Sequence, residues 1–261
     1  MPSVALTIAG SDPSGGAGIQ ADLKTFHQFG VYGEAVITLL TVQNTHRVSR
    51  VDVMAPDLVI AQLNAVIEDI PPQAAKTGAL GNREVVEALA ARAAAFSFPL
   101  VVDPVMISKH GAPLLGDDAA DALRARVIPV ATVITPNLFE AQVLARRKVE
   151  SLDDAHDAAR AICDLGARAA LVKGGHLDDG GATDVLCVGG EFHVYPARRV
   201  DTRHTHGTGC TYSAAITACL ALGLDIPHAV ARAKRFIAAA IEKNPGLGGG
   251  QGPVNHFAET D

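Results

Sequence analysis

Short apolar segments that end at a turn residue recur along this chain, and most of them are followed by a stretch with helical periodicity. Their length and their content of β-branched residues are typical of buried strands. Six such segments are present: 4–9, 34–42, 74–78, 100–106, 132–135 and 169–173. A β-hairpin is indicated further on, where 184–188 and 191–195 alternate about Gly189-Gly190. Because helices between strands imply parallel pairing, we predict a three-layer α/β/α fold with a largely parallel sheet of about seven or eight strands.

The helices expected between these strands have recognisable ends. Asn82 is a typical N-cap, and Gly30 is a typical stop signal. The predicted helices cover 19–29, 57–70, 83–95, from Asp117 or Asp118 to 126, 151 to about 166, 210–222 and 226–242. No stretch has the composition of an interdomain linker, so we expect one domain over residues 1–261.

Composition excludes several classes of function. The chain has 261 residues and a formal net charge of -6, which argues against a nucleic-acid-binding or anionic-membrane surface. No apolar run approaches the ~20 residues that a membrane span needs. Met1-Pro2-Ser3 leads directly into a strand-like segment, and the four cysteines have no CxxC spacing. We therefore expect a reduced, cytoplasmic protein without a membrane segment.

The stretch at 205–211, Thr-His-Gly-Thr-Gly-Cys-Thr, is the strongest local candidate for an active site. Gly207 and Gly209 allow a tight turn, and Thr208 is a plausible N-cap for the apolar helix that follows. Free N–H groups at such a helix start attract anions, phosphate above all. The same helix dipole is expected to lower the pKa of Cys210 and favour its thiolate. The alternative is a glycine-rich turn into a core helix with one buried cysteine.

Polar residues follow several strands, at the edge where ligands of open α/β sheets bind. The glycine-rich loop that begins at Gly10 lies there, and Gln43 offers both a donor and an acceptor to a heterocycle. Asp103 is suited to a metal or phosphate site, or to capping a turn. Asn137 and Glu140 share one helical face, a spacing that suits Mg²⁺ through water; an N-cap with a capping-box Glu is the alternative favoured by local sequence.

Taken together, these loops resemble the hydroxymethylpyrimidine/phosphomethylpyrimidine kinases of thiamine biosynthesis, within the ribokinase-like superfamily. The resemblance extends almost from end to end of the chain. The segments that carry it are 9–22 (AGSDPSGGAGIQAD), 42–45 (VQNT), 76–78 (KTG), 103–106 (DPVM), 135–137 (TPN), 173–176 (KGGH), 206–211 (HGTGCT) and 252–254 (GPV).

The resemblance implies an ATP-dependent transfer of the γ-phosphoryl group to the hydroxymethyl oxygen of a pyrimidine, and then to the resulting monophosphate. It places Asp22, Gln43 and the Gly10 region near the pyrimidine. It places Cys210 where sugar kinases of the superfamily carry an Asp base. The backbone of Gly207, Thr208 and Gly209 with Cys210 would form an anion hole. Asp103, Asn137 and Glu140 would lie near Mg²⁺, and Lys173 and Lys234 on the nucleotide side.

Three alternatives remain beside this reading. A pyridoxal kinase of the same cysteine-bearing branch is the first, and Phe139 leaves substrate preference open because related pyridoxal kinases share it. The segment 42–45 speaks against that branch. A non-catalytic pyrimidine-binding protein is the second. A thiol hydrolase with Cys210 as nucleophile is the third, with His206 the only near candidate for its base. We also expect a homo-oligomer, namely a dimer.

Overall fold

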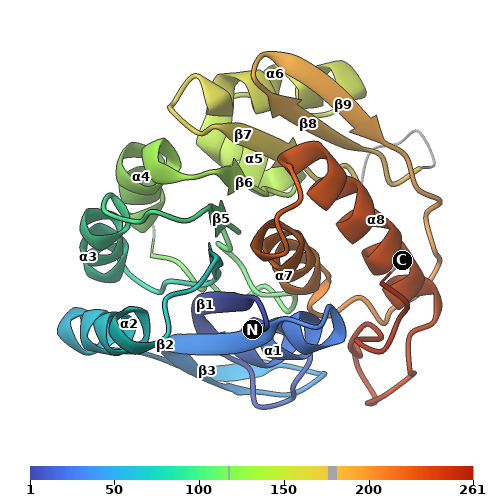
Figure 1. Cartoon of the computed structure of the whole chain (residues 1–261). Helices are drawn as coiled ribbons and strands as arrows, with labels where there is room; N and C mark the ends of the chain where they lie inside the picture. The colour runs from blue at the N-terminus through green and yellow to red at the C-terminus, as the bar shows by residue number, and fades with distance from the viewer. Residues whose placement is uncertain (117, 176–180, 261) are drawn as a thin grey trace.

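The computed structural model describes residues 1–116, 118–175 and 181–260 (Figure 1). Within this part of the chain, all the strands belong to one sheet with the order β3-β2-β1-β4-β5-β6-β7-β8-β9. The strands are β1 (Val4–Ser11), β2 (Tyr32–Gln43), β3 (Val48–Val53), β4 (Ala74–Thr77), β5 (Leu100–Val102), β6 (Val133–Ile134), β7 (Ala169–Val172), β8 (Asp184–Val188) and β9 (Glu191–Tyr195).

The centre of the sheet is parallel and both edges are antiparallel. β2, β1, β4, β5, β6 and β7 form the parallel run, whereas β3 pairs antiparallel with β2 at one edge. The predicted hairpin β8–β9 forms the other edge. The largely parallel α/β sheet is confirmed, and the sequence missed only β3. None of its residues is buried, so β3 lacks the continuous apolar run by which the buried strands were recognised.

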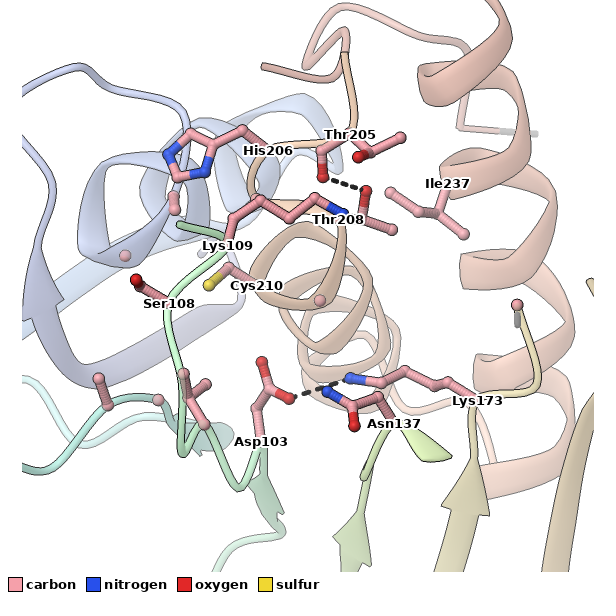
Figure 2. A pocket seen from close by; sticks show the side chains of 18 of the residues that line it. Asp103, Ser108, Lys109, Asn137, Lys173, Thr205, His206, Thr208, Cys210 and Ile237 are labelled. Atoms are coloured by element: carbon pink, nitrogen blue, oxygen red, sulfur yellow. Dashed lines mark hydrogen bonds and ion pairs between the residues drawn. The ribbon is translucent and has the colours of Figure 1, made fainter. Parts of the chain in front are cut away.

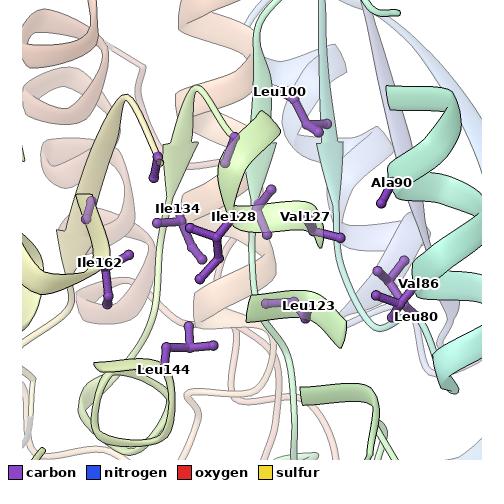
Figure 3. Packing of buried hydrophobic residues seen from close by; sticks show 14 of the residues in the cluster. Leu80, Val86, Ala90, Leu100, Leu123, Val127, Ile128, Ile134, Leu144 and Ile162 are labelled. Atoms are coloured by element: carbon purple, nitrogen blue, oxygen red, sulfur yellow. The ribbon is translucent and has the colours of Figure 1, made fainter. Parts of the chain in front are cut away.

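Helices cover both faces of the sheet, as Figure 1 shows. One face packs against α2 (Pro56–Asp69), α3 (Arg83–Ala93), α4 (Ala119–Ala122), α5 (Leu138–Ala145) and α6 (Leu152–Cys163). The other packs against α1 (Gly18–Gln28), α7 (Thr208–Ala221) and α8 (Ile226–Glu242). Successive strand residues point to opposite faces of the sheet. Val102 and Ile134 pack under α2–α6 (Figure 3 shows Ile134), and Val101 and Val133 pack under α1, α7 and α8.

Two helix predictions need correction. The helix expected up to residue 126 begins after Asp118 but is α-helical only over α4, and it continues as a π-helical turn at Leu123–Val127 and a 3₁₀ turn at Ile128–Val130. The alternative start at Asp117 lies outside the described residues. Thr208 is the first residue of α7 and not its N-cap; Gly207 takes that position with a φ of 76°, a conformation that glycine adopts without strain.

Among the described residues, no helix is both long and apolar enough to cross a membrane.

Candidate active site

A cavity of about 740 Å³ opens along the carboxyl ends of the parallel strands (Figure 2). Its walls come from the loop after β1, the end of β2, the segments after β5 and β6, the start of α7 and one face of α8. Twelve residues were expected from the sequence to form the site. Eleven of them line this cavity: Gly10, Gln43, Asp103, Asn137, Glu140, Lys173, Gly207, Thr208, Gly209, Cys210 and Lys234. The carboxyl edge of the strands is where open α/β sheets bind ligands.

The start of α7 has the geometry expected for an anion hole. Gly207 lies so close to the carbonyl oxygen of Gly16 that a Cβ atom would collide with it. Thr208 donates its hydroxyl to the carbonyl of Thr205 at 2.7 Å, which holds the turn in shape. Within the described residues no hydrogen-bond acceptor is recorded for the backbone N–H of Gly209 or its neighbour at position 210. These donors at the positive end of a 14-residue helix are available to an oxyanion.

Cys210 differs from its expected ionisation. Burial raises the pKa of the Cys210 thiol to about 12, although Lys76 and the backbone N–H of Gly18 act in the opposite direction. The carboxylates of Asp22 and Asp103 raise it further. The resting protein therefore holds a neutral thiol, and the expectation of a thiolate is wrong for this state. The position of Cys210 at a helix start could be predicted from the sequence. The burial of its sulfur and the nearby carboxylates, which raise its pKa, could not.

Asp22 lies behind the cavity wall rather than in it. Its Oδ1 is 2.7 Å from Lys76 Nζ, its Oδ2 accepts a hydrogen bond from Thr7 at 2.6 Å, and neither charged side chain exposes surface. Lys76 Nζ also donates to the carbonyl oxygen of Cys210 at 3.4 Å. Asp22, which the resemblance placed near the pyrimidine, is therefore linked to the anion hole through Lys76 and does not line the cavity itself.

Lys76 keeps its charge in this buried position. Burial lowers its pKa, but Asp22, Cys210 and Asp103 outweigh burial and raise the pKa of Lys76 above its ordinary value. The result is a fixed positive charge directly behind the anion hole. The sequence placed Lys76 at the end of a strand, but it gave no sign of the partner 54 residues away.

Asp103 and Glu140 form an acidic group around one lysine. Lys173 Nζ lies 3.1 Å from Asp103 Oδ1, and Ser213 donates to Asp103 Oδ2 at 3.2 Å. Burial raises the pKa of Glu140 to about 7; Lys173 opposes this rise and Asp103 adds to it. A buried carboxyl whose pKa is raised by a neighbouring carboxylate suits a site that receives a further cation.

The capping alternative for Asn137 and Glu140 is confirmed. Asn137 Oδ1 accepts the N–H of Glu140 at 2.9 Å, and Glu140 Oε2 accepts the N–H of Asn137 at 2.8 Å. Among the described residues no group of three or more His, Cys, Asp or Glu side chains has the arrangement of a metal site. The donors are nevertheless hard oxygens facing a cavity, and this fits Mg²⁺ held through water rather than by direct ligation.

Lysines from α8 and from the loop after β5 also face the cavity. Lys234 Nζ lies 2.7 Å from Asp184 Oδ2 and 2.6 Å from the carbonyl of Ala182. Lys109 is exposed, and Figure 2 shows its side chain pointing toward Thr205 and Thr208. It forms no ion pair with a carboxylate in the described part of the chain, so its charge is available to a ligand. The sequence analysis did not single out Lys109.

The side of the cavity at the end of β2 is lined by a hydrogen-bonded group that includes Gln43. The amide of Gln43 lies 3.2 Å from His206 Nε2, which is itself 2.8 Å from Asp12 Oδ2. No hydrogen bond between His206 and Cys210 is recorded in the described residues, and Asp12 and Gln43 occupy Nε2. The geometry therefore gives no support to a thiol hydrolase, which needs a histidine beside its nucleophile.

An α/β/α sheet with an anion hole, a row of lysines and an acidic group at its carboxyl edge has the parts of a phosphoryl-transfer enzyme. A sequence profile described as phosphomethylpyrimidine kinase matches residues 12–255, and the chain belongs to this family. A hydroxymethylpyrimidine/phosphomethylpyrimidine kinase from Synechococcus elongatus is 48% identical over 255 residues, which cover 97% of each protein.

Two solved structures show the same fold. A pyridoxal kinase from Bacillus subtilis, in an ADP complex, has a TM-score of 0.91 and 40% identity, and the match covers 99% of this chain and 98% of that one. A phosphomethylpyrimidine kinase from Clostridium difficile has a TM-score of 0.81 and 44% identity, with 92% and 99% covered.

Proposed function

We propose that this protein uses ATP to phosphorylate 4-amino-5-hydroxymethyl-2-methylpyrimidine and then its monophosphate, to give the diphosphate used in thiamine biosynthesis. The observation that carries the proposal is that Gln43 and the anion hole at 207–210 line the same cavity. The Gln43 amide is suited to bind the edge of an aminopyrimidine, and the anion hole is suited to bind the transferred phosphoryl group. Family membership supports the same reaction, and the whole of residues 1–261 would form one kinase domain.

The residues around the anion hole would divide the work of phosphoryl transfer. Backbone N–H groups of 209 and 210 would receive the charge that develops on the transferred group. Lys76, fixed behind them, adds positive potential. Cys210 would contact the substrate hydroxyl and orient it toward the transferred group, because the thiol lies in the first turn of α7 beside the hole. The hydroxyl proton would leave to an oxygen of the transferred phosphoryl group as the new P–O bond forms. Alignment and charge neutralisation are what this reaction mostly needs from a protein.

The nucleotide would lie on the opposite side of the cavity. Lys173 and Lys234 are both largely buried cavity-lining cations, suited to the phosphates of ATP. Asp103, Asn137 and Glu140 would hold Mg²⁺ through water. The ion, when bound, neutralises charge on the phosphate oxygens. Lys109 would approach the transferred group from the loop after β5.

The assembly and location of the enzyme are further parts of the proposal. We expect a homodimer, since β2 near the β3 edge carries exposed apolar side chains on one face that a second copy would cover: Leu40 and Val42. All four cysteines are free thiols, which suits the reducing cytoplasm.

A pyridoxal kinase is the second candidate, favoured by the TM-score of 0.91 to the Bacillus subtilis pyridoxal kinase. Incubation of the protein with ATP, Mg²⁺ and a panel of hydroxymethyl pyrimidines and pyridoxal, with mass detection of products, separates the two. We expect the aminopyrimidine to be preferred in direct competition. Gln43→Met should then cost roughly 1–3 kcal/mol in kcat/KM for the pyrimidine, and less for pyridoxal. Preference for pyridoxal would overturn the pyrimidine assignment and leave kinase chemistry standing.

A further inference from the structure

His206 is locked between the two ends of the fold. Its backbone N–H donates to the carbonyl of Gly252 at 3.0 Å, and its ring lies against Gly16. Its Nε2 is 2.8 Å from Asp12 Oδ2, and both side chains are 4% exposed. Asp12 accepts further hydrogen bonds from the backbone N–H groups of Ser14 and Ala17, each at 2.9 Å. Ring and carboxylate therefore have little freedom to turn.

The partners of His206 decide which ring nitrogen carries the proton. Burial raises the pKa of Asp12, but hydrogen bonds from His206 and Ser14 outweigh burial and hold that pKa below its ordinary value. Asp12 is thus a carboxylate that accepts hydrogen bonds only, so Nε2 must be the donor. His206 Nδ1 is buried and has no partner among the described residues, and a bare nitrogen is tolerated there better than an unpaired N–H. Both observations indicate a ring that carries its proton at Nε2 and leaves Nδ1 bare.

This tautomer fixes the orientation of the Gln43 amide. The structure places the amide nitrogen 3.2 Å from His206 Nε2 and the amide oxygen 3.3 Å from Thr41 Oγ1. Two donors would then face each other at His206. A half-turn of the amide leaves its shape unchanged and brings the oxygen to the Nε2–H, which Asp12 Oδ2 at 2.8 Å and the amide oxygen then share as a three-centre hydrogen bond. The amide nitrogen then donates to Thr41 Oγ1, whose own proton is given to the carbonyl of Ser11 at 2.9 Å.

The turned amide retains one acceptor site on oxygen and one donor on nitrogen. The oxygen side adjoins His206, which directly precedes the anion hole at 207–210, and the nitrogen side adjoins Thr41. In the proposed substrate, the amine is flanked by a ring nitrogen on one side and by the carbon that bears the hydroxymethyl group on the other. When the substrate's amine donates to the Gln43 amide oxygen, its ring nitrogen accepts from the Gln43 amide N–H. This pairing turns the hydroxymethyl group toward the anion hole.

We propose that His206 and Thr41 are positioning residues that hold the Gln43 amide with its oxygen toward His206, and so select an aminopyrimidine in the one register that presents its hydroxyl for phosphorylation. The proposal rests on the proposed function for its substrate. It also defines which analogue is rejected: the corresponding 4-oxo pyrimidine, which offers a carbonyl where the amine was and an N–H in place of the bare ring nitrogen.

The test compares the amino and 4-oxo substrates in wild type, Thr41→Val and Thr41→Ser. We expect wild type to prefer the amino substrate by at least ~10² in kcat/KM. In the oxo analogue, the carbonyl would face the Gln43 amide oxygen and the ring N–H would face the amide N–H, so neither hydrogen bond could form. Thr41→Val removes the acceptor that holds the amide nitrogen, so the preference should fall by about tenfold. Thr41→Ser keeps the hydroxyl and should keep the preference. A merely structural role of Thr41 would lower both rates together and leave their ratio unchanged, which would overturn the proposal.

A second measurement does not depend on turnover. In ¹⁵N-labelled unliganded protein, long-range proton–nitrogen correlation should show His206 protonated at Nε2 and bare at Nδ1 near neutral pH, with the signal assigned by its loss in His206→Phe. A ring protonated at Nδ1 alone would overturn the network. If wild type phosphorylates no pyrimidine, the proposed function fails, while the tautomer still decides whether the amide is held as inferred.

Discussion

Lys76 and Asp22 form an ion pair in which Nζ lies 2.7 Å from Oδ1 and neither side chain exposes any surface. The pair joins β4 to α1, and through the carbonyl of Cys210 it also contacts the first turn of α7. A charge taken out of water is retained only when its partner is present. The pair therefore couples the stability of the fold to the position of the anion hole.

Lys76→Met should lower the free energy of unfolding by about 3–5 kcal/mol, because Asp22 would be left as an uncompensated buried charge. Urea denaturation measures this loss. In Lys76→Met combined with Asp22→Leu, both charges are absent, and most of the stability should return while turnover stays low. A single variant as stable as wild type would show that Asp22 is protonated in the fold.

Gly207→Ala should reduce both stability and turnover, since its Cβ would meet the carbonyl of Gly16 and its φ of 76° disfavours other residues. Gly223→Ala is the matched control. Gly223 has a φ of 88° at the other end of α7, with nothing within 4 Å of the added Cβ. The control carries the backbone strain alone, so equal losses of activity in the two variants would contradict a close contact at the anion hole.

Cys210→Ala should lower kcat by ~10² or more and leave ATP affinity nearly unchanged, because the thiol would act on the substrate hydroxyl rather than on the nucleotide. Cys219→Ala removes another thiol of the same helix, one that is fully buried and does not line the cavity, and should retain most of the turnover. Steady-state rates and ATP titration measure the two effects. Similar rates in both variants would show that the Cys210 thiol has no part in the reaction and serves only in packing.

The ionisation of Glu140 should appear in the pH dependence of stability. Its folded pKa of about 7 lies above the ordinary value of 4.5, so the folded state holds a proton that the unfolded chain gives up. Stability therefore falls as pH rises through that interval. Glu140→Gln keeps an acceptor for the Asn137 N–H but does not titrate. Its Tm relative to wild type should rise from about pH 5 to about pH 8.

Mg²⁺ distinguishes the metal role of Glu140 from its capping role. Near pH 8, Mg²⁺ should raise the Tm of wild type more than that of Glu140→Gln, and the variant should need more Mg²⁺ for half-maximal rate. Parallel melting curves across pH and equal responses to the metal would leave Glu140 as a helix cap alone.

Lys109→Met should lower kcat more than it raises KM for ATP, because the charge is expected to act on the transferred group. Lys109→Arg keeps the charge and should recover most of the rate. Since Lys109 is exposed, both variants should melt close to wild type. A methionine variant with normal kcat would place the lysine outside the reaction.

The sequence predicted the elements well because each depends on local patterning. The capping box of Asn137 and the N-cap of Asn82 were legible from a few neighbouring residues. Contacts between distant segments were not. Asp12 and His206 are 194 residues apart, and the local sequence around either residue does not indicate that the other is its partner. The ionisation of Cys210 was missed for the same reason, because burial and neighbouring carboxylates are properties of the assembled fold.

The closure of the anion hole by distant parts of the chain has a consequence for folding order. Gly16 lies against Gly207, and the carbonyl of Gly252 accepts the N–H of His206, so the hole needs early and late segments at once. During synthesis the parallel strands can pair before residue 252 has left the ribosome, but the hole cannot. Contacts of such sequence separation form slowly, and the phosphate cradle should therefore be among the last parts of the molecule to assemble.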